Sequence, residues 1–425
     1  MDLSLSDEQQ QITDSAATFL AEAAAMPAVR AASESAGGLD RALWRAMAEL
    51  GWCGVHLPEA AGGLGLGLVE LVLLQEQLGR RLACVPFFDS VALAATALRG
   101  LPGSPLAQDW LARLAAGQAI GALALPDGHG GAAGAAPASN PPGQPIGFSG
   151  SKVPVAQAEP GPEAMDSIAK MPPGTPPAAA APTAVASKDG WTLQGDWPQV
   201  GSAAMADVLL LPAQAASGET LLLAVPADAP GLQVRALATL DATRRMAAVR
   251  ADAVSLPAAS CIGRGPALDA LFTQVRQLGA IALAGEQVGV AQQCLDLTLA
   301  YAAQRSQFDR PIAGFQAVKH RCAQMLVALE GARSAVYGAA CIADTAPDAA
   351  TLLLYAAQAR VAATEAAQFC AREAIQLHGG VGFTWEFDPH LYFRRAQASS
   401  QRLGAPPWWL EQVAAQLLDT PEEMA

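Results

Sequence analysis

The spacing of apolar and polar residues divides the chain into two helical parts with a strand-forming part between them. Helix signals fill the chain from Ser6 to about Ala116. Short apolar runs separated by turn residues follow from Ile120 to Val254. After Gly263, apolar residues recur at i, i+3, i+4 and i+7, as on the buried face of a helix. This order predicts an α+β fold with an N-terminal helical domain, a middle antiparallel β-domain and a C-terminal helical bundle.

The first predicted domain covers residues 1–118 and is all-helical. Ser6 and Gln9 have the spacing of a capping box, which predicts the start of a helix. A second helix is expected at about Leu39–Leu50, where Gly51 stops it. Further helices are expected at about Leu68–Leu82, Asp89–Leu98 and Pro105–Ala116.

The middle domain, residues 119–262, is predicted to be an antiparallel β-domain interrupted by an insertion. Turn pairs such as Ser217-Gly218 and Pro230-Gly231 separate its apolar runs. Strands are expected at Ile120–Leu125, Thr183–Ser187, Trp191–Gly195, Asp207–Pro212, Thr220–Val225, Leu232–Leu237 and Met246–Val254. From about 128 to 182 the chain is mainly Pro, Gly and Ala, a composition that predicts a flexible insertion because it buries little apolar surface.

The third predicted domain, residues 263–425, is a bundle of three long antiparallel helices and shorter ones. The periodicity gives helices at about Ala267–Arg305, Gln316–Thr345, Ala349–Leu377 and Pro389–Leu403. Glycines at 379 and 380 predict the end of the third of these helices.

The composition favours a cytoplasmic protein and argues against binding to nucleic acid or membrane. Hydrophobic residues make up 52% of the chain and charged residues 15%, as expected of tightly packed helices. The formal charge of −13, from 26 basic and 39 acidic residues, disfavours nonspecific nucleic-acid binding. No apolar run reaches membrane-spanning length, and the acidic N-terminus lacks the basic segment of a secretory signal.

Cysteine and histidine usage predicts no metal site. The seven cysteines are scattered singly, which indicates reduced thiols and no disulfide framework. The five histidines are equally dispersed, and none has metal-ligand spacing from a cysteine or carboxylate.

Three segments of the last third of the chain carry a family resemblance. They are Arg305-Ser306-Gln307-Phe308-Asp309-Arg310-Pro311-Ile312, Gly314-Phe315-Gln316-Ala317-Val318-Lys319-His320 and Gln376-Leu377-His378-Gly379-Gly380-Val381-Gly382-Phe383-Thr384. Together they resemble the C-terminal domain of the acyl-CoA dehydrogenase family. The Pro58-Glu59-x-x-Gly62-Gly63 loop resembles the family's N-terminal domain, and the order of helices, strands and helices is also that of the family.

Two other interpretations of the glycines do not hold. The glycines after His56 lack the third position of a dinucleotide-binding fingerprint, and Pro58 interrupts the preceding strand. His378-Gly379-Gly380 is similar to a hydrolase oxyanion loop, but the chain has no Gly-x-Ser-x-Gly motif.

The resemblance implies an FAD-dependent α,β-dehydrogenation of an acyl-CoA thioester. In that reaction a carboxylate takes a proton from Cα and the flavin takes a hydride from Cβ. Hydrogen bonds to the thioester carbonyl stabilise the developing enolate. The resemblance also implies electron-transfer flavoprotein as the electron acceptor.

Matching by motif puts FAD-binding residues at the C-terminal domain. Arg305 falls on the arginine that pairs with the FAD pyrophosphate, and a guanidinium suits that group. The positions that contact the adenosine half are Phe315, Gln316, Gln376 and Gly380. In the family these groups reach the flavin of the neighbouring subunit.

The residues that the family places against the isoalloxazine ring are replaced here. Ala124 stands at the position of a threonine, and Gln199 and Gly201 stand at the positions of a tryptophan and a second threonine. The chain is therefore expected to be better equipped to contribute to FAD binding in a neighbouring subunit than to bind an FAD of its own.

The carboxylate base is also missing from both of its family positions, which are Leu403 and Gly279 here. Glu286 lies two helical turns beyond Gly279 on the same face of the predicted helix, inside an apolar run. If buried, its carboxyl would have a raised pKa, which suits a base; a structural role in the core or an interface is the alternative. Glu386 and Asp388 are expected to be structural anchors.

These losses fit one subunit of a heteromer. Bacterial acyl-CoA dehydrogenases acting on steroid-derived thioesters have two unlike subunits, one of them degenerate at the base and ring pocket. Leu240-Asp241-Ala242-Thr243-Arg244 and the segment from Gln376 to Glu386 resemble that group. A homologous partner subunit is therefore expected; a self-sufficient homodimer using Glu286 and a non-catalytic scaffold are the alternatives.

Overall fold

The computed structural model describes residues 4–35, 37–126, 181–188 and 190–418. Apart from its last two positions, Ala181 and Pro182, the predicted insertion at about 128–182 lies outside the described residues. The domain boundaries at 118/119 and 262/263 stay a prediction. The change from helices to strands falls between Ala115 and Gly121, and the change back falls between Arg264 and Ala267.

The N-terminal part is helical, as predicted. Its elements are α1 (Asp7–Ala23), α2 (Met26–Glu34), α3 (Arg41–Glu49), η1 (Trp52–Gly54), η2 (Glu59–Ala61), α4 (Leu68–Arg81), η3 (Phe88–Ala95), α5 (Thr96–Arg99) and α6 (Pro105–Ala115). The predicted capping box is confirmed: the Ser6 hydroxyl accepts from Gln9 N at 3.2 Å, and the Gln9 side chain accepts from Ser6 N at 3.1 Å. The sequence did not predict α2, a short helix with one buried apolar side chain.

One predicted helix has an unexpected form. The segment predicted as Asp89–Leu98 begins with a π-helix, η3, and only then continues as α5. All eight residues of η3 are buried, including the polar Asp89 and Ser90. Wide helical turns of this kind are frequent at functional sites, and Asp89 is part of the site described below.

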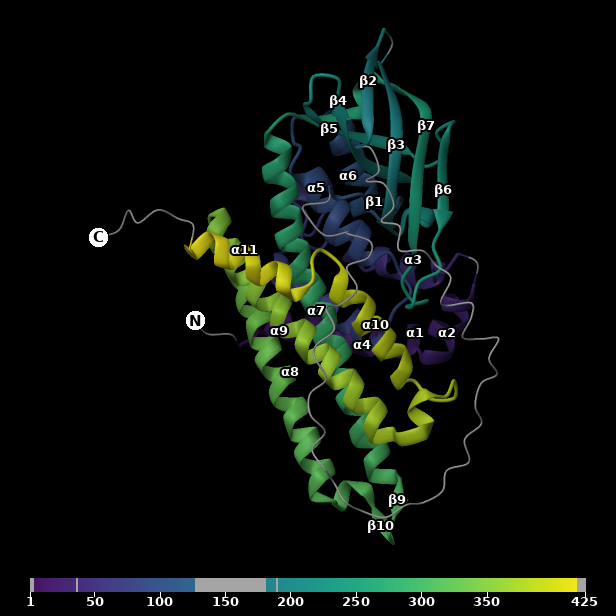
Figure 1. The fold of residues 1–425 in the computed structure, drawn as a ribbon, viewed down its shortest axis with the longest axis vertical. Coiled ribbons are helices and arrows are strands. Elements are labelled where there is room, and N and C mark those ends of the chain that lie inside the picture. Colours follow the sequence, from purple (N-terminus) through teal and green to yellow (C-terminus); the bar gives the residue numbers. More distant parts are fainter. Residues whose placement is uncertain (1–3, 36, 127–180, 189, 419–425) are drawn as a thin grey trace, which may run out of the picture. The chain divides into compact units, whose positions relative to one another are not determined.

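The middle part is one sheet with the strand order β6-β7-β3-β2-β4-β5-β8, and β1 lies beside β4 (Figure 1). Its elements are β1 (Gly121–Leu123), β2 (Thr183–Ser187), β3 (Gly190–Gly201), η4 (Ala203–Met205), β4 (Val208–Ala215), β5 (Thr220–Pro226), β6 (Leu232–Ala236), β7 (Met246–Pro257), η5 (Ala258–Ser260) and β8 (Cys261–Arg264). The purely antiparallel prediction is wrong for two pairs, because β1 and β2 both run parallel to β4. Turn signals fix antiparallel pairing only across short connections. The long segment 127–180 lies between β1 and β4, and the whole of β3 lies between β2 and β4.

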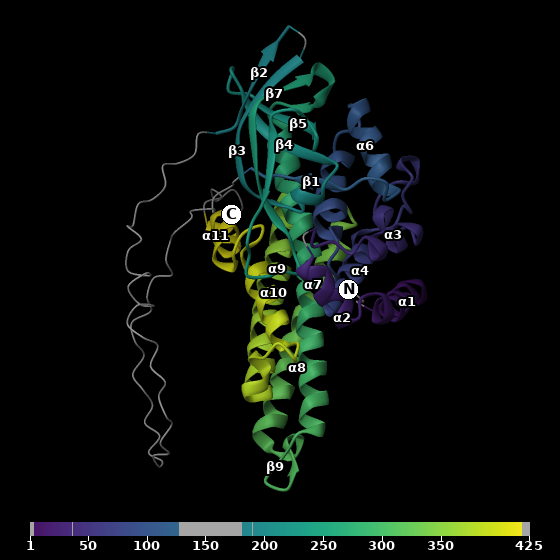
Figure 2. The ribbon, with the colours of Figure 1, turned by 90° about the vertical axis from the view of Figure 1, so that its right-hand side faces the viewer.

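The C-terminal part is the predicted bundle. Its elements are α7 (Ala267–Gln304), β9 (Ser306–Gln307), β10 (Arg310–Pro311), η6 (Ile312–Gly314), α8 (Gln316–Ala343), α9 (Ala349–His378), η7 (Gly379–Phe383), α10 (Pro389–Gln401) and α11 (Pro406–Leu418). Gly379, with φ of 65°, ends α9 as predicted. Figure 2 shows the N-terminal helices on one side of the long helices and α11, which the sequence did not predict, on the other.

Glycines let α4 and α7 pack very closely. A Cβ on Gly79 of α4 would lie 2.1 Å from the main-chain oxygen of Glu286, and one on Gly289 of α7 would lie 1.9 Å from that of Glu76. Neither position tolerates a side chain without a backbone shift. This crossing fixes Glu286 between the N-terminal helices and the bundle.

Helix α8 is less buried than a core helix. Its length and composition alone would allow it to cross a membrane, but one such helix is weak evidence. Only 33% of its most apolar 18-residue stretch is buried in the structure. The expectation that no apolar stretch reaches spanning length is therefore wrong for α8. Met325, Leu329 and Val336 are fully buried, while Leu326 and Val327 are 47% and 74% exposed. The helix thus has an apolar surface on its outer side as well.

Candidate functional site

Glu286 lies between two arginines in the interior. Its Oε1 accepts from Arg395 Nη1 at 3.1 Å, and its Oε2 is paired with Arg244 Nη2. Arg395 also donates from Nε to Asp241 Oδ2 and from Nη2 to Thr243 Oγ1, both at 2.6 Å. The network joins α7, α10 and the loop that follows β6.

The electrostatics of Glu286 differ from the prediction. Burial alone would raise the pKa of its carboxyl, but the Arg244 and Arg395 guanidiniums outweigh burial and hold this pKa below its ordinary value. The expected raised pKa is therefore wrong. The sequence identified a buried carboxylate correctly but could not show its two cationic partners.

A second ion pair lies beside strand β3. Arg402 Nη2 donates to Asp89 Oδ1, and the Ser202 hydroxyl donates to Asp89 Oδ2 at 2.6 Å. A Cβ on Gly201 would lie 2.2 Å from Asp89 Oδ1 and 2.6 Å from Arg402 Nη2. The Arg402 guanidinium also lies 4.8 Å from the centre of the Phe88 ring. The space next to Gly201 is therefore filled by a charged pair.

Arg360 fixes the segment that contains Arg402. It is fully buried on α9 and donates from Nη2 to the main-chain oxygens of Ser399 and Arg402, at 2.6 and 2.9 Å. Its Nη1 donates to Gln287 Oε1 at 2.7 Å. Burial, with the neighbouring cations Arg244 and Arg402, lowers the pKa of Arg360 to about 9. Arg360 thus connects α9 to the end of α10.

The cavity beside Glu286 is very small. Its volume is about 20 Å³, and Gln75, Phe88, Arg244 and Arg395 are among the residues around it. A space of this size holds about one water molecule. The buried Gln75 Nε2, which has no hydrogen-bond partner among the described residues, would suit such a water.

The two alternative base positions of the sequence analysis lie together. A Cβ on Gly279 of α7 would be 3.2 Å from Leu403 Cδ1 and 2.5 Å from Leu93 Cδ2. Both positions thus face one apolar contact, and neither carries an ionisable side chain.

The three positions assigned to the flavin ring have different surroundings. Ala124 is buried and donates from its main-chain N to Leu210 O at 3.0 Å. Gln199 is exposed on β3, and Gly201 is buried against the Asp89–Arg402 pair. The described residues therefore do not fit a flavin ring at Gly201 without displacement of this pair.

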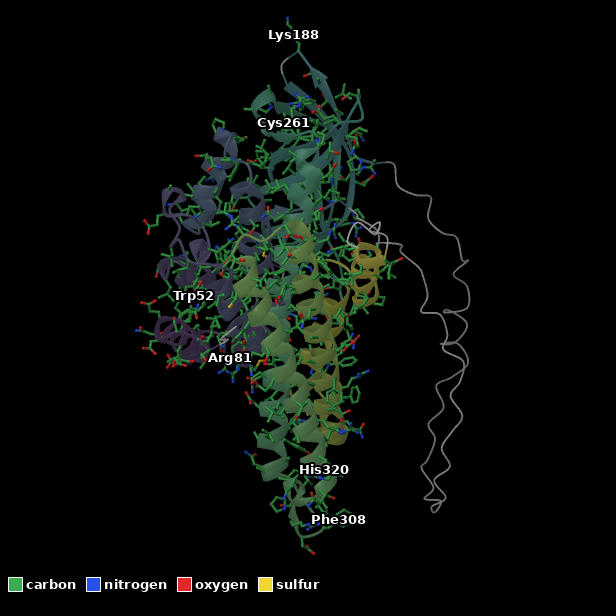
Figure 3. All side chains as sticks on the ribbon, turned by 90° about the vertical axis from the view of Figure 1, so that its left-hand side faces the viewer. Trp52, Arg81, Lys188, Cys261, Phe308 and His320 are labelled. Atoms are coloured by element: carbon green, nitrogen blue, oxygen red, sulfur yellow. The ribbon has the colours of Figure 1, made fainter. Side chains whose placement is uncertain are left out.

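The residues predicted to bind the pyrophosphate and the adenosine half of FAD lie around one end of the bundle. Arg305 follows the end of α7, Phe315 and Gln316 begin α8, and Gln376 and Gly380 mark the end of α9. Tyr301 of α7 stacks on His378 of α9 with ring centres 4.3 Å apart, so these helix ends are adjacent. Figure 3 shows Phe308 and His320 at this end, far from Lys188 at the sheet.

This end of the bundle is exposed and rich in cationic and aromatic side chains. Arg305, Gln316, Gln376 and Gly380 are exposed, and a Cβ on Gly380 would meet nothing within 4 Å. Arg310 lies over the Phe315 ring at 4.0 Å, and Phe308 is 87% exposed. These features suit contact with an anionic, partly aromatic group.

Asp388 is an anchor, as predicted. Its Oδ1 accepts from Arg30 Nη2 at 2.7 Å, which links the start of α10 to α2. Glu386 is exposed, and a hydrogen bond from the Thr384 side chain lowers the pKa of its carboxyl.

The part of the chain that the structure describes contains no cluster of three or more His, Cys, Asp or Glu side chains that could hold a metal ion. All seven cysteines are free.

Several residues of the buried network were missed by sequence reasoning. They are Asp89, Arg244, Arg360, Arg395 and Arg402. The available signal was a single charged residue within an apolar segment, as with Arg360 in its Ala-rich helix. Such a signal indicates a buried charge but not its partner.

The fold and these helix ends define the class of protein. Residues 6–118 match the family description "Acyl-CoA dehydrogenase, N-terminal domain", and residues 271–418 match "Acyl-CoA dehydrogenase, C-terminal domain". The chain belongs to the acyl-CoA dehydrogenase family of oxidoreductases, whose members are generally FAD-dependent.

Several relatives match nearly the whole chain. Acyl-CoA dehydrogenase IpdE2 of Mycobacterium tuberculosis is 32% identical over 417 residues, which are 98% of this chain and 99% of the relative. Acyl-CoA dehydrogenase FadE27 of the same organism is 30% identical over 394 residues, 90% of this chain and 89% of the relative.

Two solved structures of protein pairs are also similar. The ChsE4–ChsE5 complex from Mycobacterium tuberculosis matches with a TM-score of 0.79 and 27% identity, over 99% of this chain and 100% of that chain. The Tcur3481–Tcur3483 steroid ACAD matches with a TM-score of 0.76 and 28% identity, over 97% of this chain and 98% of that chain.

Proposed function

We propose that this chain is the base-lacking subunit of a heteromeric, FAD-dependent acyl-CoA dehydrogenase. The observation that carries the proposal is the Asp89–Arg402 pair beside Gly201, at 2.2 and 2.6 Å from the place of a Cβ. A flavin ring facing Gly201 would have to displace this ion pair. Separating such a pair is costly because each charge would lose its partner in the interior.

The lack of a suitable base supports the same conclusion. Gly279 and Leu403 have no proton-accepting group. Glu286 remains ionised with a lowered pKa, and both of its oxygens accept hydrogen bonds from arginines. A carboxylate of this kind is a weak base towards a Cα–H. These features count against the self-sufficient homodimer.

The contribution of this chain would be to bind FAD seated mainly in the partner subunit. Arg305 would pair with the pyrophosphate, while Phe315, Gln316, Gln376 and Gly380 would contact the adenosine half. Their exposure at one end of the bundle supports this role. When bound, FAD supplies hydride acceptance in the family's reaction, and the partner would supply the base.

The similarity to two protein pairs, ChsE4–ChsE5 and the Tcur3481–Tcur3483 steroid ACAD, supports a heteromer and a bulky, steroid-derived acyl-CoA substrate. The exposed apolar side of α8, with Leu326 and Val327, supports assembly with another subunit. We further propose electron-transfer flavoprotein as the electron acceptor and the cytoplasm as the location.

The test compares this chain expressed alone with the chain co-expressed with an acyl-CoA dehydrogenase subunit encoded beside it. We expect colourless protein alone and a yellow complex whose flavin absorbance is bleached by acyl-CoA. Flavin bound and bleached in the lone chain would overturn the proposal in favour of the homodimer. Absence of flavin from a stable complex of both subunits would leave only a scaffold role.

A further inference from the structure

A second cavity lies at the N-terminal end of α4, away from the charged network. Its volume is about 340 Å³, which is within the range of small-molecule pockets. It lies next to Leu278 of α7, about 12 Å along the helix axis from Glu286. The polar side chains of His56, Thr96, Arg99 and Asp344 lie around it, together with apolar side chains such as those of Leu68 and Leu278.

The cavity contains a buried imidazole with an unused nitrogen. His56 is 5% exposed, and its Nε2 lies 3.0 Å from Thr96 Oγ1. Its Nδ1 is buried and has no hydrogen-bond partner among the described residues. Burial, assisted by the Arg99 charge, lowers the pKa of His56 to about 3, so the ring is neutral. A buried nitrogen without a hydrogen-bond partner is unfavourable, so a ligand or a water molecule is expected to form a hydrogen bond with it.

Arg99 provides the cationic side chain of the cavity. Its Nη1 donates to the main-chain oxygen of His56 at 3.0 Å, which leaves its other N–H groups for a ligand. The facing carboxylate, Asp344, accepts from the main-chain N of Leu68 and Val69 at 2.7 and 3.2 Å. Asp344 thus caps α4. Leucine side chains at positions 66, 68, 278 and 352 also line the cavity, so a ligand with one negative group and an apolar body can contact both kinds of surface.

We propose that this cavity binds a small organic carboxylate with an apolar body. The carboxylate would accept hydrogen bonds from Arg99 and from Nδ1–H of His56, while the Thr96 hydroxyl donates to Nε2. The apolar body would lie against Leu68, Leu278 and Leu352. This site needs neither FAD nor a partner subunit, so it is independent of the proposed function.

The experiment is a calorimetric titration of the full chain with octanoate and, separately, with octanamide, which has the same length and no charge. We expect saturable binding of octanoate and much weaker binding of octanamide. Arg99→Gln should weaken octanoate binding about tenfold or more, since a hydrogen bond to a charged group is lost. Arg235→Gln, at an exposed position on β6, is the matched control and should bind like the unmodified chain.

Three results would overturn the proposal: no saturable binding of octanoate, equal binding of octanamide, or unchanged binding after Arg99→Gln. Circular dichroism would check that Arg99→Gln folds. If it does not, Ala343→Leu decides the question, because the larger side chain fills the cavity from α8. Octanoate binding lost in Ala343→Leu supports the site, and binding retained in it contradicts the site.

Discussion

Leu403 packs directly against Gly279, with its Cδ1 3.2 Å from the place of a Cβ on that glycine. The two residues are 124 positions apart in the sequence, and they are the two positions at which the family resemblance predicts the base. Their contact means that a carboxylate at either position would reach the same region of the interior. This chain has a hydrogen atom at one position and an apolar side chain at the other.

Restoring a carboxylate at this contact should not make the chain a dehydrogenase. We expect Leu403→Glu, expressed alone, to remain without flavin and without acyl-CoA-dependent dye reduction. The reason is that the Asp89–Arg402 pair still fills the space beside Gly201. Leu403→Gln has nearly the same shape and no charge, and is the control. Flavin bleaching by Leu403→Glu but not by Leu403→Gln would show that only the base had been lost.

The sequence predicted those parts of the fold that depend on local spacing. The periodicity placed a helix at about Ala267–Arg305, and α7 spans Ala267–Gln304. The capping box at Ser6 is present. The parallel pairing of β1 and β2 with β4 could not be predicted, because β1 meets β4 across the segment 127–180 and β2 meets β4 across the whole of β3, and neither contact leaves a local pattern.

The candidate site was only partly predictable for the same reason. Glu286 stood out as a charge in an apolar run, but its partners Arg244 and Arg395 are 42 and 109 positions away. The direction of its pKa shift depends on those partners, so a prediction from burial alone gave a raised pKa where the pKa is lowered. The residues predicted to bind FAD were identified by motif, and their common location at one bundle end depends on the antiparallel order of α7, α8 and α9.

Loss of the Arg305 guanidinium should weaken FAD binding in the assembled complex. We expect Arg305→Ala to weaken FAD retention about tenfold, the effect of removing a charge-assisted hydrogen bond. The side chain is exposed, so the fold should be unaffected. Flavin fluorescence after dialysis of the complex measures the released fraction. Arg235→Ala, on exposed β6, should release no more than the unmodified complex. Equal retention in all three proteins would contradict the assignment of Arg305.

Glu286 should stabilise the fold in a pH-dependent way. Replacement by Gln leaves Arg244 and Arg395 without their shared buried anion, so Glu286→Gln should lower the free energy of unfolding by about 3–5 kcal/mol at neutral pH. Because the pKa of Glu286 is lowered in the folded protein, its contribution is complete above the ordinary carboxyl pKa of 4.5 and is lost as pH falls through the lowered value.

Urea unfolding at neutral pH and at about pH 3 tests this pH dependence. The difference in the free energy of unfolding between the unmodified chain and Glu286→Gln should be large at neutral pH and smaller at acid pH. Glu330→Gln is the control. The Glu330 side chain is 51% exposed beside Arg333, so this replacement should change the free energy of unfolding by less than about 1 kcal/mol. A difference that stays constant or grows on acidification would exclude an ionised Glu286 with a lowered pKa.

Two glycines should respond differently to an added methyl group. At Gly201 the new Cβ would meet Asp89 and Arg402 within 2.6 Å, so Gly201→Ala should lower the free energy of unfolding by about 1–3 kcal/mol. At Gly380 nothing lies within 4 Å, so Gly380→Ala should leave the stability of the lone chain within about 1 kcal/mol. In the complex, however, Gly380→Ala should increase FAD release, because the methyl group would stand where the backbone approaches the adenosine half. Urea unfolding of the lone chain and flavin retention in the complex measure the two effects separately. If Gly201→Ala is as stable as the unmodified chain, the Asp89–Arg402 pair is free to move aside, and a flavin ring could enter this subunit after all.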